Sequence, residues 1–144
     1  MTQCNLNTII LLHKKWLNGE PEGKKADLSN TNLSNTNLHG ANLHGADLHG
    51  AILSGANLNG ANLNDANLND AILHGADVDF SSWPLWCGSL KGVKVDSRIA
   101  RQLAYHLCSV VCDDPEFISA RNQILPFANK FHRVCECGKL KKVG

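Results

Sequence analysis

The sequence predicts a β solenoid with helical segments on both sides of it, and three observations support this prediction. Residues 26–80 divide without a gap into eleven units of five residues. The third position of these units is Leu ten times and Val78 once, and the first position is Ala nine times and Thr twice. Both flanks lack this period and instead carry apolar residues at helical spacing.

A period of five residues fits neither an α-helix nor an ordinary β-strand. It places two small or apolar side chains on one side of each unit and three polar ones on the other, and a single unit cannot bury its Leu alone. Stacked units would align the Leu side chains in an internal column, with Ala where a larger side chain would overpack. Asn, Asp and Gly at the other positions suit tight turns. Disordered low-complexity sequence is the alternative, but disorder requires no Leu at every fifth position.

The motif Ala-(Asp/Asn)-Leu-X-X resembles that of the pentapeptide-repeat family, over 55 of the 144 residues. The resemblance implies a right-handed quadrilateral β-helix with four units per coil, here about three coils, with Leu and the preceding Ala or Thr pointing inward. Some members of this family resemble DNA in shape and charge, and bind topoisomerases or other DNA-handling proteins. The resemblance therefore implies a protein-binding function without catalysis.

Four units per coil would stack residues twenty positions apart on the same face. The six Asp residues of the repeat then fall on three faces: Asp27, Asp47 and Asp70 on the first, Asp77 and Asp79 on the second, and Asp65 on the third. We predict that these acidic faces bind the partner. The four repeat histidines (His39, His44, His49, His74) would lie on four different faces, and so could not bind one metal together.

The remaining face carries no charge and has Ile52 and Ile72 where Asn or Asp is usual. Two exceptions in one column predict an apolar docking strip that is covered by the N-terminal segment, the C-terminal segment or a second subunit. Two exposed Ile side chains are the alternative reading, since single apolar residues are common on surfaces.

Residues 1–25 are predicted to form an N-terminal capping helix and turn. Apolar spacing favours a helix over 5–18 that ends near Asn18-Gly19. A Leu column that ends abruptly would expose an apolar cross-section, so a lid is required. We expect Leu6, Ile9, Ile10 and Trp16 to form it. An amphipathic helix that binds a partner is the alternative.

Residues 81–144 are predicted to form a helical C-terminal region that packs on the open end of the solenoid. Asp96 would be the N-cap of a helix over 97–111, and Pro115 would begin a second helix that reaches about Leu125. Phe127, Phe131 and Val134 suggest a third helix. The apolar face expected for the first of these helices consists of Ile99, Leu103, His106, Leu107 and Val110.

Charge is unevenly distributed along the chain. Residues 26–80 carry six Asp and no Lys or Arg, whereas residues 81–144 carry ten basic and five acidic residues. Such asymmetry concerns partners rather than fold. The function expected is an acidic solenoid that inhibits or shields a nucleic-acid-handling protein, for example as a phage-encoded inhibitor of a host enzyme or defence system. The alternative is a scaffold whose basic tail, with Arg98, Arg101 and Arg133, mediates dimerisation or partner binding; direct nucleic-acid binding is not expected from so modest a charge.

The C-terminal region also contains enough Cys and His residues for a tetrahedral zinc site. The weak candidate set is Cys87, His106, His132 and Cys137, but the usual C-x₂-C spacing is absent. Reduced cysteines that pack as small apolar residues are the alternative. No nucleophile signature or Gly-rich phosphate loop occurs, so we expect neither a cofactor nor an enzyme.

No stretch approaches the roughly 18 apolar residues that a membrane span needs. The run Ile9-Ile10-Leu11-Leu12 is too short for the core of a signal peptide. The sequence therefore predicts a cytoplasmic protein with reduced thiols.

Overall fold

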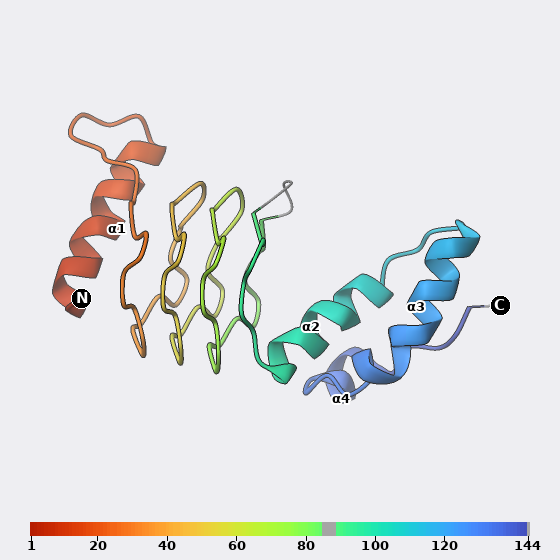
Figure 1. The fold of residues 1–144 in the computed structure, drawn as a ribbon. Coiled ribbons are helices and arrows are strands. Elements are labelled where there is room, and N and C mark those ends of the chain that lie inside the picture. The colour runs from red at the N-terminus through yellow and green to blue at the C-terminus, as the bar shows by residue number, and fades with distance from the viewer. Residues whose placement is uncertain (85–88, 144) are drawn as a thin grey trace. The chain divides into compact units, whose positions relative to one another are not determined.

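The computed structural model describes residues 1–84 and 89–143. Its helices are α1 (Gln3–Leu17), α2 (Ser97–Cys108), α3 (Pro115–Ala128) and α4 (Val134–Cys137), and the repeats lie between α1 and α2 (Figure 1). The chain divides into two compact units, Met1–Lys94 and Val95–Gly144. Residues 81–84 and 89–94, expected in the C-terminal region, thus lie in the first unit. In the part of the chain that the structure describes, no helix has the length and apolar character to cross a membrane.

The repeats form coils that stack in parallel, with a register of twenty residues. Each described contact of the ladder is a single-residue bridge rather than a longer strand, for example Asn32 with Ile52 and Ile52 with Ile72. Ile52 N–H donates to Thr31 O of the preceding coil (2.9 Å), and Leu33 N–H donates to Ile52 O (2.8 Å). Twenty residues in units of five give four sides per coil, so the predicted register is confirmed.

The interior of the solenoid is a column of Leu side chains. From Leu28 to Val78, every third-position side chain is at most 1% exposed, including the stack of Leu38, Leu58 and Val78. Full burial of one such side chain stabilises the fold by roughly 1.5–3 kcal/mol. The fifth position has a left-handed backbone throughout, which accounts for its Gly, Asn and Asp residues. Phe80 (φ 58°) has the same left-handed backbone, although it is not Gly, Asn or Asp.

A further stretch of ladder, which the sequence reading missed, follows the last repeat. Leu68 N–H donates to Ser89 O (3.0 Å) and Asp70 N–H to Lys91 O (2.9 Å). Lys94 forms a parallel bridge with Ile72, so the offset is 22 residues here, whereas Ser82 still pairs with Asn62 at an offset of 20. Residues 89–94 therefore continue the solenoid after an insertion of two residues, which hides their period.

Helix α1 caps the first coil through side chains that imitate the ladder. The Gln3 amide donates to Asn37 O (3.0 Å) and accepts from Asn37 N–H (3.0 Å), and His13 Nδ1 accepts from Ala26 N–H (3.0 Å). Leu6 and His13 are fully buried, whereas Trp16 is 42% exposed and stacks on the His13 ring. The expectation that Trp16 belongs to the lid is wrong, because the buried ring of His13 occupies that place.

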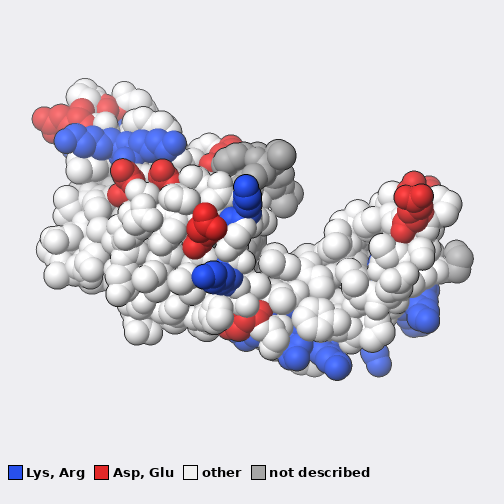
Figure 2. Space-filling view, viewed as in Figure 1, with Lys and Arg blue, Asp and Glu red and all other residues white. Residues whose placement is uncertain are grey.

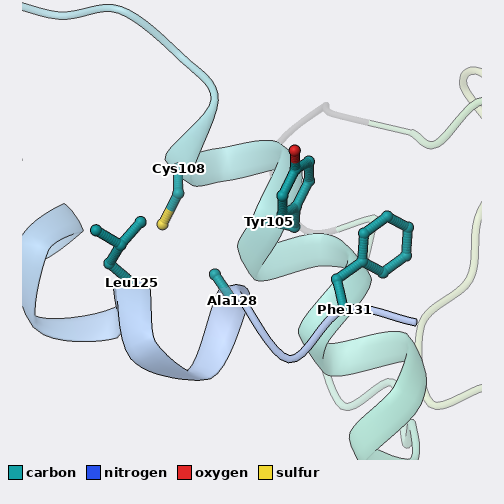
Figure 3. Close-up of a cluster of buried hydrophobic side chains, with 5 residues drawn as sticks. All are labelled: Tyr105, Cys108, Leu125, Ala128 and Phe131. Atoms are coloured by element: carbon teal, nitrogen blue, oxygen red, sulfur yellow. The ribbon is translucent and has the colours of Figure 1, made fainter. Parts of the chain in front are cut away.

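The helical unit has a small core of its own, formed by Tyr105, Cys108, Leu125, Ala128 and Phe131 (Figure 3). The predicted N-cap Asp96 is confirmed, since it accepts from Ile99 N–H (3.0 Å). The second helix begins at Pro115 as predicted, and Asp114 caps it by accepting from Phe117 N–H (2.8 Å).

The predicted apolar face of α2 is partly wrong. Its buried residues are Ile99, Gln102, Tyr105 and Cys108, whereas His106, Leu107 and Val110 are exposed. Helix α3 packs on the side that carries Tyr105 and Cys108, so the buried face of α2 is rotated by about one residue relative to the predicted apolar face. The predicted third helix is reduced to the short α4, since α3 continues to Ala128.

Candidate functional site

Three carboxylates lie on one side of the solenoid, and we call this surface (Asp27, Asp47, Asp70) the acidic face. Asp27 and Asp47 form a parallel bridge, so they occupy adjacent coils of one column, at a separation of about 4.8 Å per coil. Asp70 ends the unit of the third coil that stacks on the same side, because Asp47 also bridges Asn67. The register thus brings together side chains that lie twenty or more residues apart in the sequence.

Two carboxylates of the acidic face, those of Asp27 and Asp47, are oriented by hydrogen bonds. Asp27 Oδ1 accepts from the Ser29 hydroxyl (2.7 Å) and from Ser29 N–H (3.0 Å), and these bonds lower the pKa of Asp27 below its ordinary value. Asp47 Oδ1 accepts from His49 N–H (3.0 Å) and Asn67 Nδ2 (3.1 Å). Hydrogen bonds to the charged form of Asp27 favour its ionisation.

The other aspartates of the repeat lie on the remaining sides. Asp77 Oδ1 accepts from Asp79 N–H (3.0 Å), and Asn59 Nδ2 donates to Asp77 Oδ2 (3.4 Å). Asp65 lies 3.7 Å from His44 Nδ1 in the adjacent coil. Charge is therefore distributed over three sides, and only the acidic face carries three carboxylates.

Lysines limit the acidic face at both ends. Lys24 and Lys25 precede it in the sequence, and the backbone of Lys91 pairs with that of Asp70. Residues 1–94 contain six Lys and eight acidic residues, which gives a net charge of −2. Figure 2 shows blue and red side chains close together on this unit. The acidic face is accordingly a short patch rather than a long, uniformly negative rod.

The predicted apolar strip is a column of two Ile residues between polar neighbours. Ile52 is 37% exposed and Ile72 is half-buried. The bridges place Asn32 before Ile52 and Lys94 after Ile72 in this column. The idea that a flanking segment or second subunit covers the strip stays a prediction.

Within residues 1–84 and 89–143, no three His, Cys, Asp or Glu side chains come together as a metal-binding group. Cys87 of the zinc candidate lies outside these residues, and His106, His132 and Cys137 are exposed. Cys108 is buried beside Leu125 (Figure 3), and burial raises the pKa of its thiol, against a smaller opposite effect of Arg121. This thiol packs as an apolar group.

The basic residues singled out from the sequence are largely engaged within the helical unit. The Arg101 guanidinium lies over the ring of Phe127 (5.6 Å), and Arg133 pairs with Glu136. Arg98 is half-buried. The exposed cations that the sequence reading missed are Lys139, Lys141 and Lys142 near the C-terminus. In the sequence these residues are marked only by a short run of lysines.

Comparisons with known proteins agree with the repeat pattern. The family described as Pentapeptide repeats matches residues 24–55 and 51–81, with eight copies. No curated protein matches the chain. A similar solved structure is Rfr23, a pentapeptide repeat protein from the cyanobacterium Cyanothece 51142, with 46% identity over 49% of this chain and 44% of that one and a TM-score of 0.40.

Two further solved structures show the same kind of likeness. HetL, a pentapeptide repeat protein involved in heterocyst differentiation regulation from Nostoc sp. strain PCC 7120, is 37% identical over 48% of this chain and 34% of its own, with a TM-score of 0.26. A trypsin-treated form of QnrB1, a plasmid-mediated fluoroquinolone resistance protein, is 24% identical over 60% of this chain and 43% of its own, with a TM-score of 0.31. The match spans less than half of each of these proteins. The repeat motif and its register together show that residues 24–81 of the chain are pentapeptide repeats.

Proposed function

We propose that the protein is a non-enzymatic binding module whose acidic face binds a nucleic-acid-handling protein and inhibits or shields it. The observation that carries this proposal is the fixed orientation of the Asp27 and Asp47 carboxylates on adjacent coils. Immobilising a flexible side chain on binding costs roughly 0.5–1.5 kcal/mol. Carboxylates that are already ordered avoid much of this cost.

The chemistry of the acidic face matches Arg and Lys side chains of a partner. Charge-assisted hydrogen bonds to carboxylates are about twice as strong as neutral ones, and Arg can form two of them to one carboxylate. The interior of the solenoid is filled mainly by Leu and Ala side chains, which supports binding rather than catalysis.

The spacing of the acidic face favours a partner with a small phosphate-binding surface. Coils repeat at about 4.8 Å, and phosphates of one duplex strand recur at about 3.4 Å along the axis. A basic groove that accepts two or three phosphates can therefore accept these carboxylates. The lysines at both ends of the face exclude mimicry of a long DNA segment.

Partner capture with two matched variants tests the proposal. Asp27, Asp47 and Asp70→Asn removes the acidic face, whereas Asp65, Asp77 and Asp79→Asn removes the same charge from the other sides. Tagged proteins are incubated with lysate of the source cell, and bound proteins are quantified by mass spectrometry. We expect the first variant to lose a nucleic-acid-handling partner that the second retains. Equal retention, or equal loss, by both variants would contradict the proposal.

A second candidate function is a scaffold that binds its partner through the helical unit. The observation that favours it is an exposed apolar surface at the end of α2, formed by Leu107, Val110 and the 91%-exposed Val111. Isolated apolar side chains are ordinary on surfaces, but a contiguous group indicates an interaction site. In the same capture experiment, Leu107 and Val110→Ser would abolish partner binding if this second function is correct.

A further inference from the structure

The last residues of the chain are tied to the helical unit by several side chains. Chain ends are usually poorly ordered unless such contacts hold them. Asn129 pairs with both backbone groups of Leu140, donating to its O (2.9 Å) and accepting from its N–H (2.9 Å). Asn122, seven residues earlier on α3, pairs in the same way with Val143 (2.8 and 3.2 Å). These two amides hold residues 139–143 along the helix.

Two further side chains fix the same segment. Buried Arg121 donates from a terminal guanidinium nitrogen to Lys141 O (3.0 Å) and from Nε to Cys108 O (2.7 Å). The Tyr105 hydroxyl lies 2.6 Å from Gly138 O and donates to it. Apart from the bond to Cys108 O, these contacts are made to the backbone of residues 138–143, so they do not engage the lysine side chains of that segment.

The clamped backbone directs lysines outward. Leu140 is half-buried against the core, whereas Lys139, Lys141 and Lys142 are exposed, and we call these three residues the lysine row. Lys130, also exposed, directly follows the Asn129 clamp. In extended backbone, alternate residues such as Lys139 and Lys141 lie about 6.6–6.8 Å apart on one side. Cations spaced along an anchored backbone suit a regularly repeating polyanion.

Charge within the helical unit is segregated. Figure 2 shows its blue side chains along one edge and red ones gathered at the opposite end of this view. The sequence places three of its five acidic residues, Asp113, Asp114 and Glu116, at the start of α3, whereas the clamps begin two turns later at Asn122. Glu136 is paired with Arg133. Residues 138–143, which carry the lysine row, contain no Asp or Glu.

We propose that the lysine row, extended by Lys130, binds the phosphate backbone of a nucleic acid. The net charge of residues 81–144 is too modest to predict such binding. The structure, however, shows exposed lysines close together on an anchored backbone. Four phosphate contacts to a single strand predict a slope of about −3 for the logarithm of the association constant against that of salt concentration. This site uses none of the residues of the acidic face.

Fluorescence polarisation with labelled single-stranded and duplex oligonucleotides tests the proposal at low salt. Lys139, Lys141 and Lys142→Gln should weaken binding at least tenfold and reduce the salt slope by about 2. Lys14, Lys24 and Lys91→Gln removes the same charge from the first unit and should change the affinity less than twofold. Asn122 and Asn129→Ala keeps all charges but releases the segment, and should weaken binding several-fold.

The outcomes separate the possibilities cleanly. The proposal is supported if either oligonucleotide binds and the three variants change its affinity as expected. The oligonucleotide that binds more tightly identifies the form of nucleic acid. No binding at low salt, an equal effect of the two lysine variants, or an unchanged affinity after release of the segment would overturn it. Equally tight binding of poly-glutamate would also overturn it, in favour of an acidic protein. The Asp27, Asp47 and Asp70→Asn variant should bind nucleic acid undiminished, so this site and the acidic face can fail separately.

Discussion

The solenoid and the helical unit achieve order by different means. Each coil of the solenoid repeats the same backbone hydrogen bonds to its neighbours and adds Leu side chains to one column. The helical unit instead depends on single side chains, such as Arg121 and Asn129, that join segments distant in the sequence. A repeated contact is visible in a sequence as a period, whereas a unique contact is not.

The largest effect is expected from a cavity in the middle of the solenoid. Leu58→Ala should lower the free energy of unfolding by about 3–5 kcal/mol, because the neighbouring coils cannot collapse into the space. Leu107→Ala, at a half-exposed position of the helical unit, should change it by less than about 0.5 kcal/mol. Urea titration followed by Trp fluorescence measures the first, since all three Trp residues lie in Met1–Lys94. A cost below 1 kcal/mol for Leu58→Ala would contradict a dry, fully packed column.

The next effect concerns the unique contacts of the helical unit. Arg121→Ala leaves Cys108 O and Lys141 O without their cationic donor and should destabilise this unit by about 2–3 kcal/mol. Arg133→Ala, which removes a partly exposed ion pair, should cost no more than about 1 kcal/mol. Hydrogen exchange of residues 95–144 is the measurement. Faster exchange in the solenoid after Arg121→Ala would show that the two regions are not stabilised separately.

Adding one methyl group at the junction between α1 and the first coil should destabilise the fold. A Cβ at Gly23 would collide with the backbone N of Trp16, so Gly23→Ala must displace the helix and should cost about 2 kcal/mol. At Gly40 a Cβ meets nothing within 4 Å, but the φ of +63° makes Gly40→Ala cost about 1 kcal/mol. Thermal unfolding followed by Trp fluorescence compares the two. A larger loss for Gly40→Ala would contradict the close approach at the cap.

The smallest effect is a dependence of the cap on pH. Burial is the main cause that lowers the pKa of His13 below 6.5, the nearby Lys25 charge adds to it, and the His44 backbone acts in the opposite sense. The unfolded chain therefore binds this proton more readily, so stability is complete above pH 6.5 and decreases as the pH falls through the lower, folded pKa. Protonated Nδ1 also cannot accept from Ala26 N–H. Urea midpoints between pH 7.5 and 5 should fall less in His13→Asn than in the exposed control His39→Asn; equal falls would contradict this role.

The sequence predicted the parts of the fold that rest on period and on local capping. The five-residue repeat, with the four units per coil that the family resemblance implies, was enough to place Asp27 above Asp47 and Ile52 above Ile72. Asp96 and Pro115 marked the starts of two helices. Residues 89–94 were missed because an insertion of two residues shifts their register, although Leu90 and Gly92 keep the third and fifth positions of a unit.

The helical unit was less predictable, for the same physical reason. The buried side of α2 depends on where α3 packs, and no pattern within α2 states this, so Leu107 was assigned to the wrong side. The clamps from Asn122 and Asn129 to the C-terminal segment are single long-range contacts without any period. The lysine row could therefore be identified only from the structure, whereas the acidic face was predicted from the sequence.

The most direct test of the central claim is the salt dependence of binding between the protein and its captured partner. Calorimetric titration over a range of salt concentrations gives one slope for each protein. Ordered carboxylates on one face predict a steep slope for the unmodified chain, a much flatter one for Asp27, Asp47 and Asp70→Asn, and an unchanged one for Asp65, Asp77 and Asp79→Asn. Identical slopes for the two variants would mean that the partner responds to total charge, and the claim for the acidic face would then be wrong.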